Sequence, residues 1–149
     1  MKRFTLILFA SILSLVACKK DAKQPETLDA PATIVFDGDF GKTLGTYSSY
    51  ATATPTTKGT GTVSIAITYT GDVKTLSFTT PTSAVTNNLG TVNVSGGSYT
   101  FTKLVKDLRG PADAPLPTSG TSGSVVLTVT ATLGNGTVLK RFYTITITG

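Results

Sequence analysis

Alternation of apolar residues with threonine and other small or polar residues is the feature that most restricts the fold of this chain. Between Val125 and Leu133 every second residue is apolar, and threonine fills most positions between. A period of two is typical of a half-buried β-strand, and no window repeats apolar residues at helical spacing for three turns. Alternation and short apolar runs predict seven strands, over residues 34–36, 62–69, 75–79, 92–94, 99–101, 125–133 and 139–147. We therefore expect an all-β chain folded as an antiparallel β-sandwich, with a barrel as the alternative.

The hydrophobic pattern also predicts the register of the last two strands, which are joined by Gly134-Asn135-Gly136. A two-residue loop would pair Ala131 with Lys140 and turn most apolar residues of the final strand outward. A three-residue loop pairs Ala131 with Leu139 and keeps the apolar residues on one face, because a one-residue slip inverts every side chain. Only Arg141 is then on the apolar face, where its long stem can carry the guanidinium to the edge. We predict the three-residue loop, as a type I turn closed by Gly136 in the left-handed region. The further pairs expected are Leu127 with Tyr143 and Val125 with Ile145.

The first residues have the three parts of an export signal. Lys2 and Arg3 form a positive n-region, and the apolar stretch from Phe4 to Val16 is too short to span a bilayer comfortably. The stretch ends in Leu15-Val16-Ala17-Cys18, which resembles a bacterial lipobox. That resemblance implies cleavage before Cys18, a diacylglyceryl thioether on its sulfur and often an N-acyl chain, which together hold the protein on a membrane. An ordinary secretory signal with a chance cysteine is the alternative.

The resemblance divides the chain into three parts: a signal peptide over residues 1–17, a flexible polar tether over 18–31, and one domain over 32–149. The tether begins Cys18-Lys19-Lys20-Asp21, which resembles the start of many outer-membrane lipoproteins of the Bacteroidota. In that group, charged residues after the cysteine can accompany export. The resemblance implies a lipid-anchored outer-membrane protein on the cell surface, with the periplasmic face as the alternative.

The order of the predicted strands, with a long closing hairpin, resembles the immunoglobulin-like sandwiches of many surface proteins. This resemblance covers roughly Pro31 to Gly149 and rests on pattern alone. The chain has no tryptophan and Cys18 is its only cysteine, so the disulfide and the tryptophan of antibody domains are absent. Such sandwiches carry many unrelated functions, so the resemblance predicts a fold and not an activity.

Composition excludes several kinds of chemistry. The chain contains no histidine, which excludes nucleophiles activated by histidine and histidine-ligated metal sites. The net charge is +5, and removal of Lys2 and Arg3 leaves +3, scattered along the chain, which does not favour a nucleic-acid partner. No predicted strand brings two carboxylates together in an apolar setting, as a glycosidase would need. We therefore expect no enzyme, and an enzyme using Asp37 and Asp39 is a distant alternative.

A weak calcium motif is the nearest approach to a metal site. Asp37 and Asp39 flank a glycine and can offer carboxylate oxygens to a hard cation. In an immunoglobulin-like topology Asp107 and Asp113 would lie at the same pole. No complete calcium loop is present, so a solvated turn stabilised by aspartate side chains is the main interpretation, and we predict no cofactor beyond the lipid on Cys18.

Two tyrosines are the candidate contact residues for a partner. Tyr47 and Tyr50 lie in a polar stretch where no core alternation includes both, and tyrosine offers a flat face with a polar tip. The alternative is that one packs in an edge strand and the other covers the flank. Tyr69, Tyr99 and Tyr143 fall on alternating positions and are expected in the core.

The long connections over residues 37–61, 81–89 and 103–122 are predicted to lie at the pole farthest from the tether. Within the last of them, Leu104, Val105 and Leu108 are expected to form a turn that plugs the open end of the sandwich.

These observations predict a non-catalytic binding or structural module of the cell envelope, acting through the distal loops. Its partner would be an envelope protein or an extracellular polysaccharide, and its lipid would hold it on the membrane. The alternative is a glycan-binding lipoprotein similar to the accessory proteins of polysaccharide-uptake systems.

Overall fold

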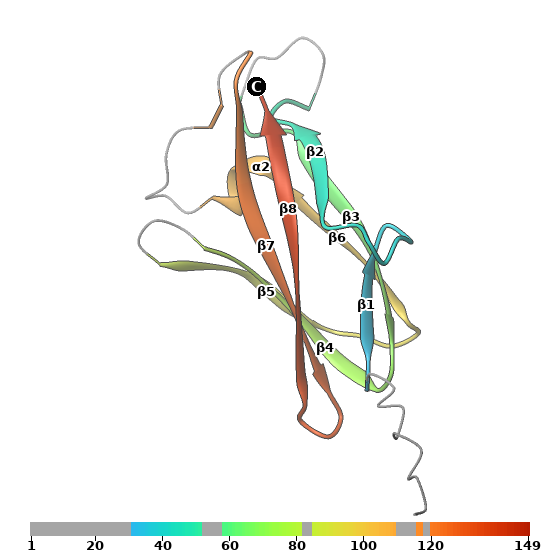
Figure 1. Cartoon of the computed structure of the whole chain (residues 1–149). Coiled ribbons are helices and arrows are strands. Elements are labelled where there is room, and N and C mark those ends of the chain that lie inside the picture. The colour runs from blue at the N-terminus through green and yellow to red at the C-terminus, as the bar shows by residue number, and fades with distance from the viewer. Residues whose placement is uncertain (1–30, 52–57, 82–84, 110–115, 118–119) are drawn as a thin grey trace, which may run out of the picture.

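The computed structural model describes residues 31–51, 58–81, 85–109, 116–117 and 120–149, and within them the chain is an all-β protein with two sheets. Figure 1 shows the strands and a single short helix. The elements are β1 (Thr33–Phe36), β2 (Leu44–Ser48), β3 (Thr62–Thr70), β4 (Val73–Pro81), β5 (Thr86–Asn93), β6 (Ser98–Leu104), α2 (Val105–Leu108), β7 (Ser122–Leu133) and β8 (Val138–Thr148). The all-β prediction is confirmed.

The strands form a three-stranded sheet in the order β1-β3-β6 and a five-stranded sheet in the order β2-β8-β7-β4-β5. All strand pairs are antiparallel except β2 with β8, which is parallel and pairs Leu44 with Thr144 through Ser48 with Thr148. The expectation of wholly antiparallel strands was therefore wrong at this one edge. The chain leaves the three-stranded sheet at Phe36 and joins the five-stranded sheet at Leu44, so β1 and β2 belong to different sheets.

Strand β2 is the strand that the alternation pattern missed, and it makes eight strands instead of about seven. Its sequence from Leu44 to Ser48 places Leu44 outward and Gly45 inward, which reverses the usual hydrophobic pattern. Strand β5 is also longer than the predicted segment 92–94. Its first half contains Asn and Gly residues, which do not give the alternation of apolar residues that predicts a strand. An irregularity opposite Phe78 and Thr79, where Gly90 has φ 119°, interrupts its pairing with β4.

The predicted hairpin register is confirmed. Ala131 pairs with Leu139, and both further pairs form as expected. The Gly136 N–H donates to the Leu133 carbonyl oxygen at 2.9 Å, and Gly136 has φ 83°, in the left-handed region that a three-residue loop requires. Tyr143, which pairs with Leu127 in the hairpin, also packs edge-to-face against Phe36 at the end of β1, with ring centroids 5.0 Å apart.

Both sheets contribute buried side chains to one hydrophobic cluster. On β3 the inward residues are Val63, Ile65, Ile67 and Tyr69, and on β7 they are Val125 to Leu133 at every second position. Tyr69 and Tyr143 are buried and Tyr99 packs against the cluster, as predicted. Burial of these side chains, which both sheets contribute, is the main contribution to the stability of a chain that has no disulfide bond.

The short helix α2 confirms the predicted turn. Val105 and Leu108 are buried, and the Leu108 carbonyl oxygen accepts a hydrogen bond from the buried Thr80 hydroxyl at 2.7 Å. Asn87 Nδ2 donates to the Asp107 carbonyl oxygen at 3.0 Å. Thr80 of β4 and Asn87 of β5 thus hold the helix in position at the end of the core through these two hydrogen bonds.

The two ends of the described chain lie at opposite ends of the molecule in Figure 1, with Pro31 near the β7–β8 turn and Gly149 beside the start of β7. Helix α2 lies toward the end of the molecule that carries Gly149. The segment 37–43 lies on the flank, about midway along the molecule, so the expectation that it belongs to the far pole was wrong. Its position follows from the shortness of β1, which ends after four residues.

Candidate functional site

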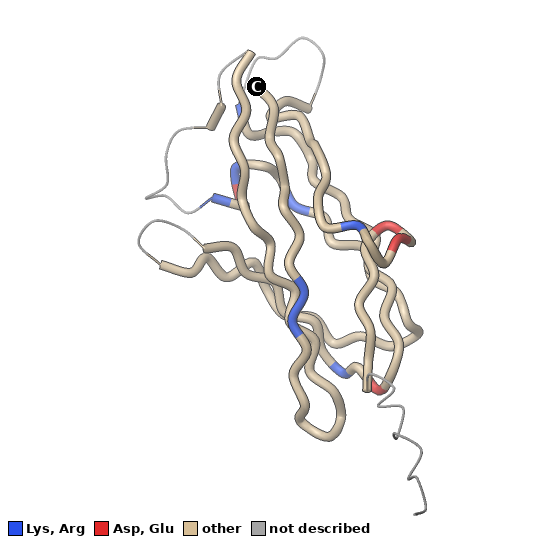
Figure 2. The backbone as a smooth tube through the Cα atoms, viewed as in Figure 1, with Lys and Arg blue, Asp and Glu red and all other residues tan. Residues whose placement is uncertain are grey.

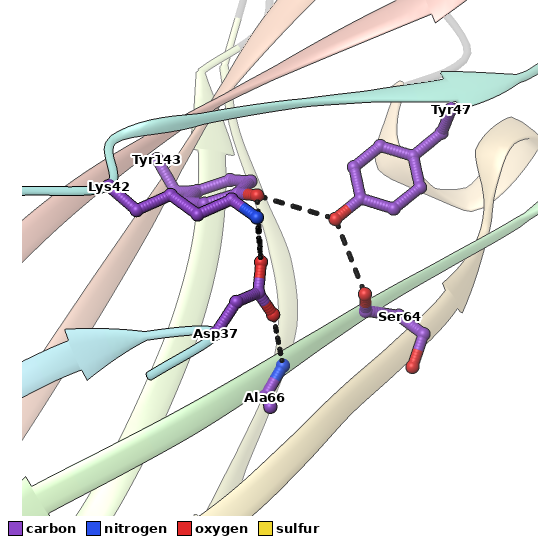
Figure 3. A network of polar contacts seen from close by, with 6 residues as sticks. All are labelled: Asp37, Lys42, Tyr47, Ser64, Ala66 and Tyr143. Atoms are coloured by element: carbon purple, nitrogen blue, oxygen red, sulfur yellow. Dashed lines mark hydrogen bonds and ion pairs between the residues drawn. The ribbon is translucent and has the colours of Figure 1, made fainter. Parts of the chain in front are cut away.

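The densest polar cluster of the described residues surrounds Asp37 on this flank, as Figure 3 shows. Asp37 follows β1 and has φ 49°, a left-handed conformation that aspartate tolerates better than most residues. Its backbone N–H donates to the Ala66 carbonyl oxygen at 2.7 Å, and its Oδ1 accepts the Ala66 N–H at 2.9 Å. Asp37 therefore extends the pairing of β1 with β3 by one residue through its side chain.

The other carboxylate oxygen of Asp37 connects the two sheets. Oδ2 accepts a hydrogen bond from the Tyr143 hydroxyl of β8 at 3.2 Å and lies 2.9 Å from Nζ of Lys42. The Tyr47 hydroxyl of β2 donates to the Ser64 carbonyl oxygen of β3 at 3.3 Å and lies 3.5 Å from the Tyr143 hydroxyl. The cluster therefore links the two sheets at the point where the chain passes from β1 to β2.

Electrostatics fix the charge states of the cluster. Burial acts to raise the pKa of Asp37, but the hydrogen bonds from Lys42 and Ala66 and the positive charge of Lys42 hold it below its ordinary value. The hydrogen bond to Asp37 raises the pKa of Lys42. Burial, followed by the contact with Tyr47, raises the pKa of Tyr143 well above the usual value of a tyrosine. Asp37 is ionised and Tyr143 is a neutral donor at neutral pH.

Three donors of the protein hold the Asp37 carboxylate: the Ala66 N–H, the Tyr143 hydroxyl and Lys42 Nζ. Both carboxylate oxygens are held by groups of the protein itself, so the side chain has a structural role in the fold. Asp39 Oδ1 accepts the Gly41 N–H at 2.8 Å, which is the local turn that the main interpretation of this segment predicts.

The proposed calcium ligands do not come together. In the described part of the chain no three acidic, cysteine or histidine residues form a group that could hold a metal ion. Figure 2 shows the acidic segment after β1 on the flank, away from the acidic position of α2, which carries Asp107. Asp113 lies outside the described residues. The premise that these carboxylates share one pole was wrong, because β1 is too short to carry Asp37 to the end of the molecule.

The two candidate tyrosines have different environments. Tyr47 is half-buried and packs against the core, and its hydroxyl joins the Asp37 cluster. Tyr50 is half-buried, and its backbone N–H donates to Oγ of Ser48 at 3.1 Å. Tyr47 thus matches the alternative of packing in an edge strand, and only Tyr50 remains as a tyrosine of the distal segment.

Arg141 lies on the inward face of β8 but reaches the flank, as predicted. Its guanidinium carbon is 5.6 Å from the ring centroid of Phe36 and 5.0 Å from that of Phe40, and Nη2 donates to the Phe40 carbonyl oxygen at 3.1 Å. The aromatic rings shield the arginine stem, and the charge stays at the edge of the core.

A second candidate surface is the outer face of the five-stranded sheet. Phe142 on β8 is 58% exposed, and Leu44 on β2 is 59% exposed. The pairing aligns Leu44, Thr144 and Val126 in one row across the three strands, and Phe142 lies in the next row opposite Thr128. These three apolar side chains form the outer patch: Leu44, Val126 and Phe142.

Small hydroxyl residues surround the outer patch. The outward positions are Leu44, Thr46 and Ser48 on β2, Val138, Lys140, Phe142, Thr144, Thr146 and Thr148 on β8, Ser122, Ser124, Val126, Thr128, Thr130 and Thr132 on β7, Thr75, Ser77 and Thr79 on β4, and Asn88, Thr91 and Asn93 on β5. Lys140 is the one charged residue among these positions, and the exposed Lys74 of β4, which is paired with Asp72, lies beside them. Exposed aromatic side chains with few charged neighbours are typical of the core of a contact surface.

Cys18 and the rest of the lipobox lie outside the described residues. Within the described part of the chain, no helix has the length and apolar character needed to cross a bilayer.

Comparison with known proteins adds little. No protein-family model matches the chain, and no curated protein matches it. Among solved structures the chain is similar to murine CRIg, with a TM-score of 0.37 and 11% sequence identity over 78% of this chain and 96% of that chain.

Proposed function

We propose that this protein is a non-catalytic, lipid-anchored module of the bacterial cell envelope that binds a partner through the outer face of its five-stranded sheet. The lipid is attached to Cys18 of the lipobox and holds the protein in the outer membrane, facing the cell surface, as in the Bacteroidota lipoproteins that its start resembles. The tether between Cys18 and Pro31 gives the folded part freedom to orient toward its partner.

The folded part is an immunoglobulin-like β-sandwich in this proposal. Support comes from the sheet orders, in which β1 joins the three-stranded sheet and β2 joins the five-stranded sheet beside the closing hairpin. The single buried cluster shared by both sheets also supports a sandwich.

The observation that carries the binding proposal is the outer patch. Exposed large apolar side chains stabilise nothing while they contact water, and a group of them on one face of a small protein marks an interaction surface. Phe142 has no partner in the core that would explain its apolar side chain, because its neighbours Arg141 and Tyr143 point to the opposite side of the sheet.

The non-catalytic part of the proposal has separate support. The chain lacks histidine, and the Asp37 carboxylate is held by three structural donors. A general acid needs a proton to give, and the lowered pKa of Asp37 leaves its carboxylate ionised at neutral pH.

A glycan partner remains the alternative. An aromatic ring surrounded by hydroxyl groups can stack on a sugar ring and bond to its hydroxyls, and threonines surround Phe142. The face offers few of the planar polar side chains that orient sugars, with Asn88 and Asn93 at its far edge on β5. The composition of the face therefore favours a protein partner.

The test is site-specific photo-crosslinking in the full chain in the membranes of its host. A photo-reactive phenylalanine analogue replaces Phe142, and matched variants carry it at Tyr50 in the distal segment and at Val35 on the outer face of the three-stranded sheet. We expect a discrete adduct from position 142 and none from Val35. An adduct only from Tyr50 would move the site to the distal loops, and a glycosidase-sensitive smear would favour the glycan alternative. No adduct at any position would refute the binding proposal.

A further inference from the structure

We propose that the occupant of this face is a second copy of the chain, so that two copies pack face to face, side by side on one membrane, around a two-fold axis. This inference rests on the proposed function, because it names the partner that the outer face contacts. A two-fold contact brings the same surface of both copies together, so the face must be complementary to itself.

Charge favours self-association through this face. Residues 31–149 contain eight lysines and arginines against five aspartates, a net charge of +3, so two copies repel each other over most orientations. The exposed positions on the strands of the five-stranded sheet include two cations, Lys140 and Lys74, of which Lys74 is paired with Asp72. Packing through this face therefore brings few like charges together.

The apolar residues distinguish this face from the other neutral one. The outward positions of the three-stranded sheet, such as Thr68 and Thr100, are also uncharged, but none of the exposed large apolar side chains of the described chain lies there. Four of them lie on the outer face of the five-stranded sheet: Leu44, Val126, Val138 and Phe142. A neutral surface with apolar anchors gains free energy from burial, whereas a neutral surface of threonines does not.

The face is large enough for a dimer. Strand β8 has 11 residues, about 36 Å at 3.3 Å per residue, and five strands about 4.8 Å apart extend roughly 19 Å across. The planar footprint is about 700 Å², close to the roughly 800 Å² that each partner contributes to a standard interface.

The tether geometry agrees with such a pair. Strands β7 and β8 run the length of the molecule, and Pro31 lies at the end that carries their turn, as Figure 1 shows. A two-fold axis along this length places both Pro31 residues at the same end. The chain from Cys18 to Pro31 can reach at most about 45 Å, so both anchors can enter one membrane.

Pairing through the sheet edges is opposed by the strands themselves. Natural proteins protect edges with short strands, irregular pairing and inward-pointing charges. Strands β1 and β2 have four and five residues, β5 is interrupted at Gly90, and β6 carries the half-buried Lys103 at an inward position. Residues 138–143 of β8 also form an edge, since β2 pairs only with Thr144–Thr148, and the half-buried Arg141 gives this stretch an inward charge. Contact through the face avoids these edges.

Cysteine crosslinking in the full chain tests the proposal. Cys18 is the only native cysteine and its thiol is consumed by the lipid, so the wild-type chain controls for background. Thr144→Cys places a thiol between Leu44 and Val126, and the matched control Thr100→Cys places one on the outer face of the three-stranded sheet. With a short bismaleimide on intact membranes we expect a dimer band from Thr144→Cys and none from Thr100→Cys. Equal bands from both, or no band from Thr144→Cys, would overturn the proposal.

A second substitution shows whether the outer patch drives the pair. In the Thr144→Cys chain, Phe142→Thr removes the aromatic anchor from both copies, and we expect the dimer band to fall by more than about tenfold. Phe40→Thr is the matched control, because Phe40 is 63% exposed but lies on the flank beside Arg141, and it should leave the band unchanged. Protease resistance of each variant checks its folding, and Leu44→Thr should weaken the band in the same direction as Phe142→Thr. A band unaffected by Phe142→Thr in a folded chain would overturn the proposal.

The outcomes separate this inference from the proposed function. A photo-adduct at Phe142 with the mass of a different molecule, without a Thr144→Cys dimer, leaves the binding face in place and refutes the second copy as its occupant. The absence of both signals refutes both.

Discussion

Truncation of Leu127 to alanine tests which side of the closing hairpin is the core. Leu127 is fully buried at the middle of β7 and pairs with Tyr143. Leucine-to-alanine changes in cores cost about 2–5 kcal/mol, and the cost rises with the cavity that the surroundings fail to fill. Strand β7 is hydrogen-bonded to β4 on one side and β8 on the other, so its backbone cannot move inward to fill the space. We expect a loss in the upper half of that range, about 3–5 kcal/mol.

The assay is urea denaturation of the chain from residue 32 onward, with the free energy of unfolding and its urea dependence compared between variants. Two controls accompany Leu127→Ala. Leu127→Met keeps the side-chain volume and should cost less than about 1.5 kcal/mol. Thr128→Ala changes the outward neighbour and should cost less than about 1 kcal/mol, the range of strand propensity. For a domain of this size a loss of about 3 kcal/mol lowers Tm by roughly 10–20 °C.

Equal losses for Leu127→Ala and Thr128→Ala would refute the assignment of the inward face. A Leu127→Ala loss below about 1 kcal/mol with an unchanged urea dependence would show that the space between the sheets collapses, which contradicts the argument from strand pairing.

Three further predictions concern the Asp37 cluster and the anchor. Tyr143→Phe removes the hydroxyl that donates to Asp37 and keeps the ring, so it should lower the free energy of unfolding by about 1.5–3 kcal/mol in the same urea assay. Because the pKa of Asp37 is lowered in the folded state, its contribution is present above the unfolded pKa, about 3.9, and is lost as the pH falls through the folded value. The stability difference between the wild type and Asp37→Asn should therefore be constant near neutral pH and shrink as the pH falls below about 4, and a difference at pH 2 as large as that at pH 7 would contradict this. Cys18→Ser should move the protein from the membrane fraction to the soluble fraction, and an unchanged distribution on fractionation would exclude the lipid as the anchor.

The sequence allowed the strands with strict alternation to be predicted, because a buried face imposes a period of two. Residues 125–133 and 139–147 gave both the hairpin and its register, and the register followed from placing Arg141 at the edge. Strand β2 was missed because its pairing partner, β8, lies about 100 residues away and its own residues alternate weakly. Local pattern contains no information about such a parallel edge pair.

The candidate site was predicted less well for the same physical reason. Asp37 and Tyr143 are 106 residues apart, and their hydrogen bond depends on where β1 ends relative to β8. Tyr47 was interpreted as a surface residue because the strand that turns it inward was not recognised. The outward position of Phe142 follows from the hairpin register alone, since the adjacent Tyr143 is inward.

The crossing of the chain between the sheets also determines how the protein carries mechanical load. A pull on the two ends of the described chain would load β2 from its first residue, by way of β1, and β8 from its last, since the two strands run parallel and Leu44 to Ser48 pair with Thr144 to Thr148. Such a pull slides the strands along each other, so the hydrogen bonds between them bear the force together instead of opening one after another. Asp37, with its bonds to Lys42, Ala66 and Tyr143, lies directly before this ladder in the path of the force. Rupture is governed by the unfolding barrier and not by equilibrium stability. Substitutions at Asp37 are therefore expected to lower the resistance of the chain to such a pull.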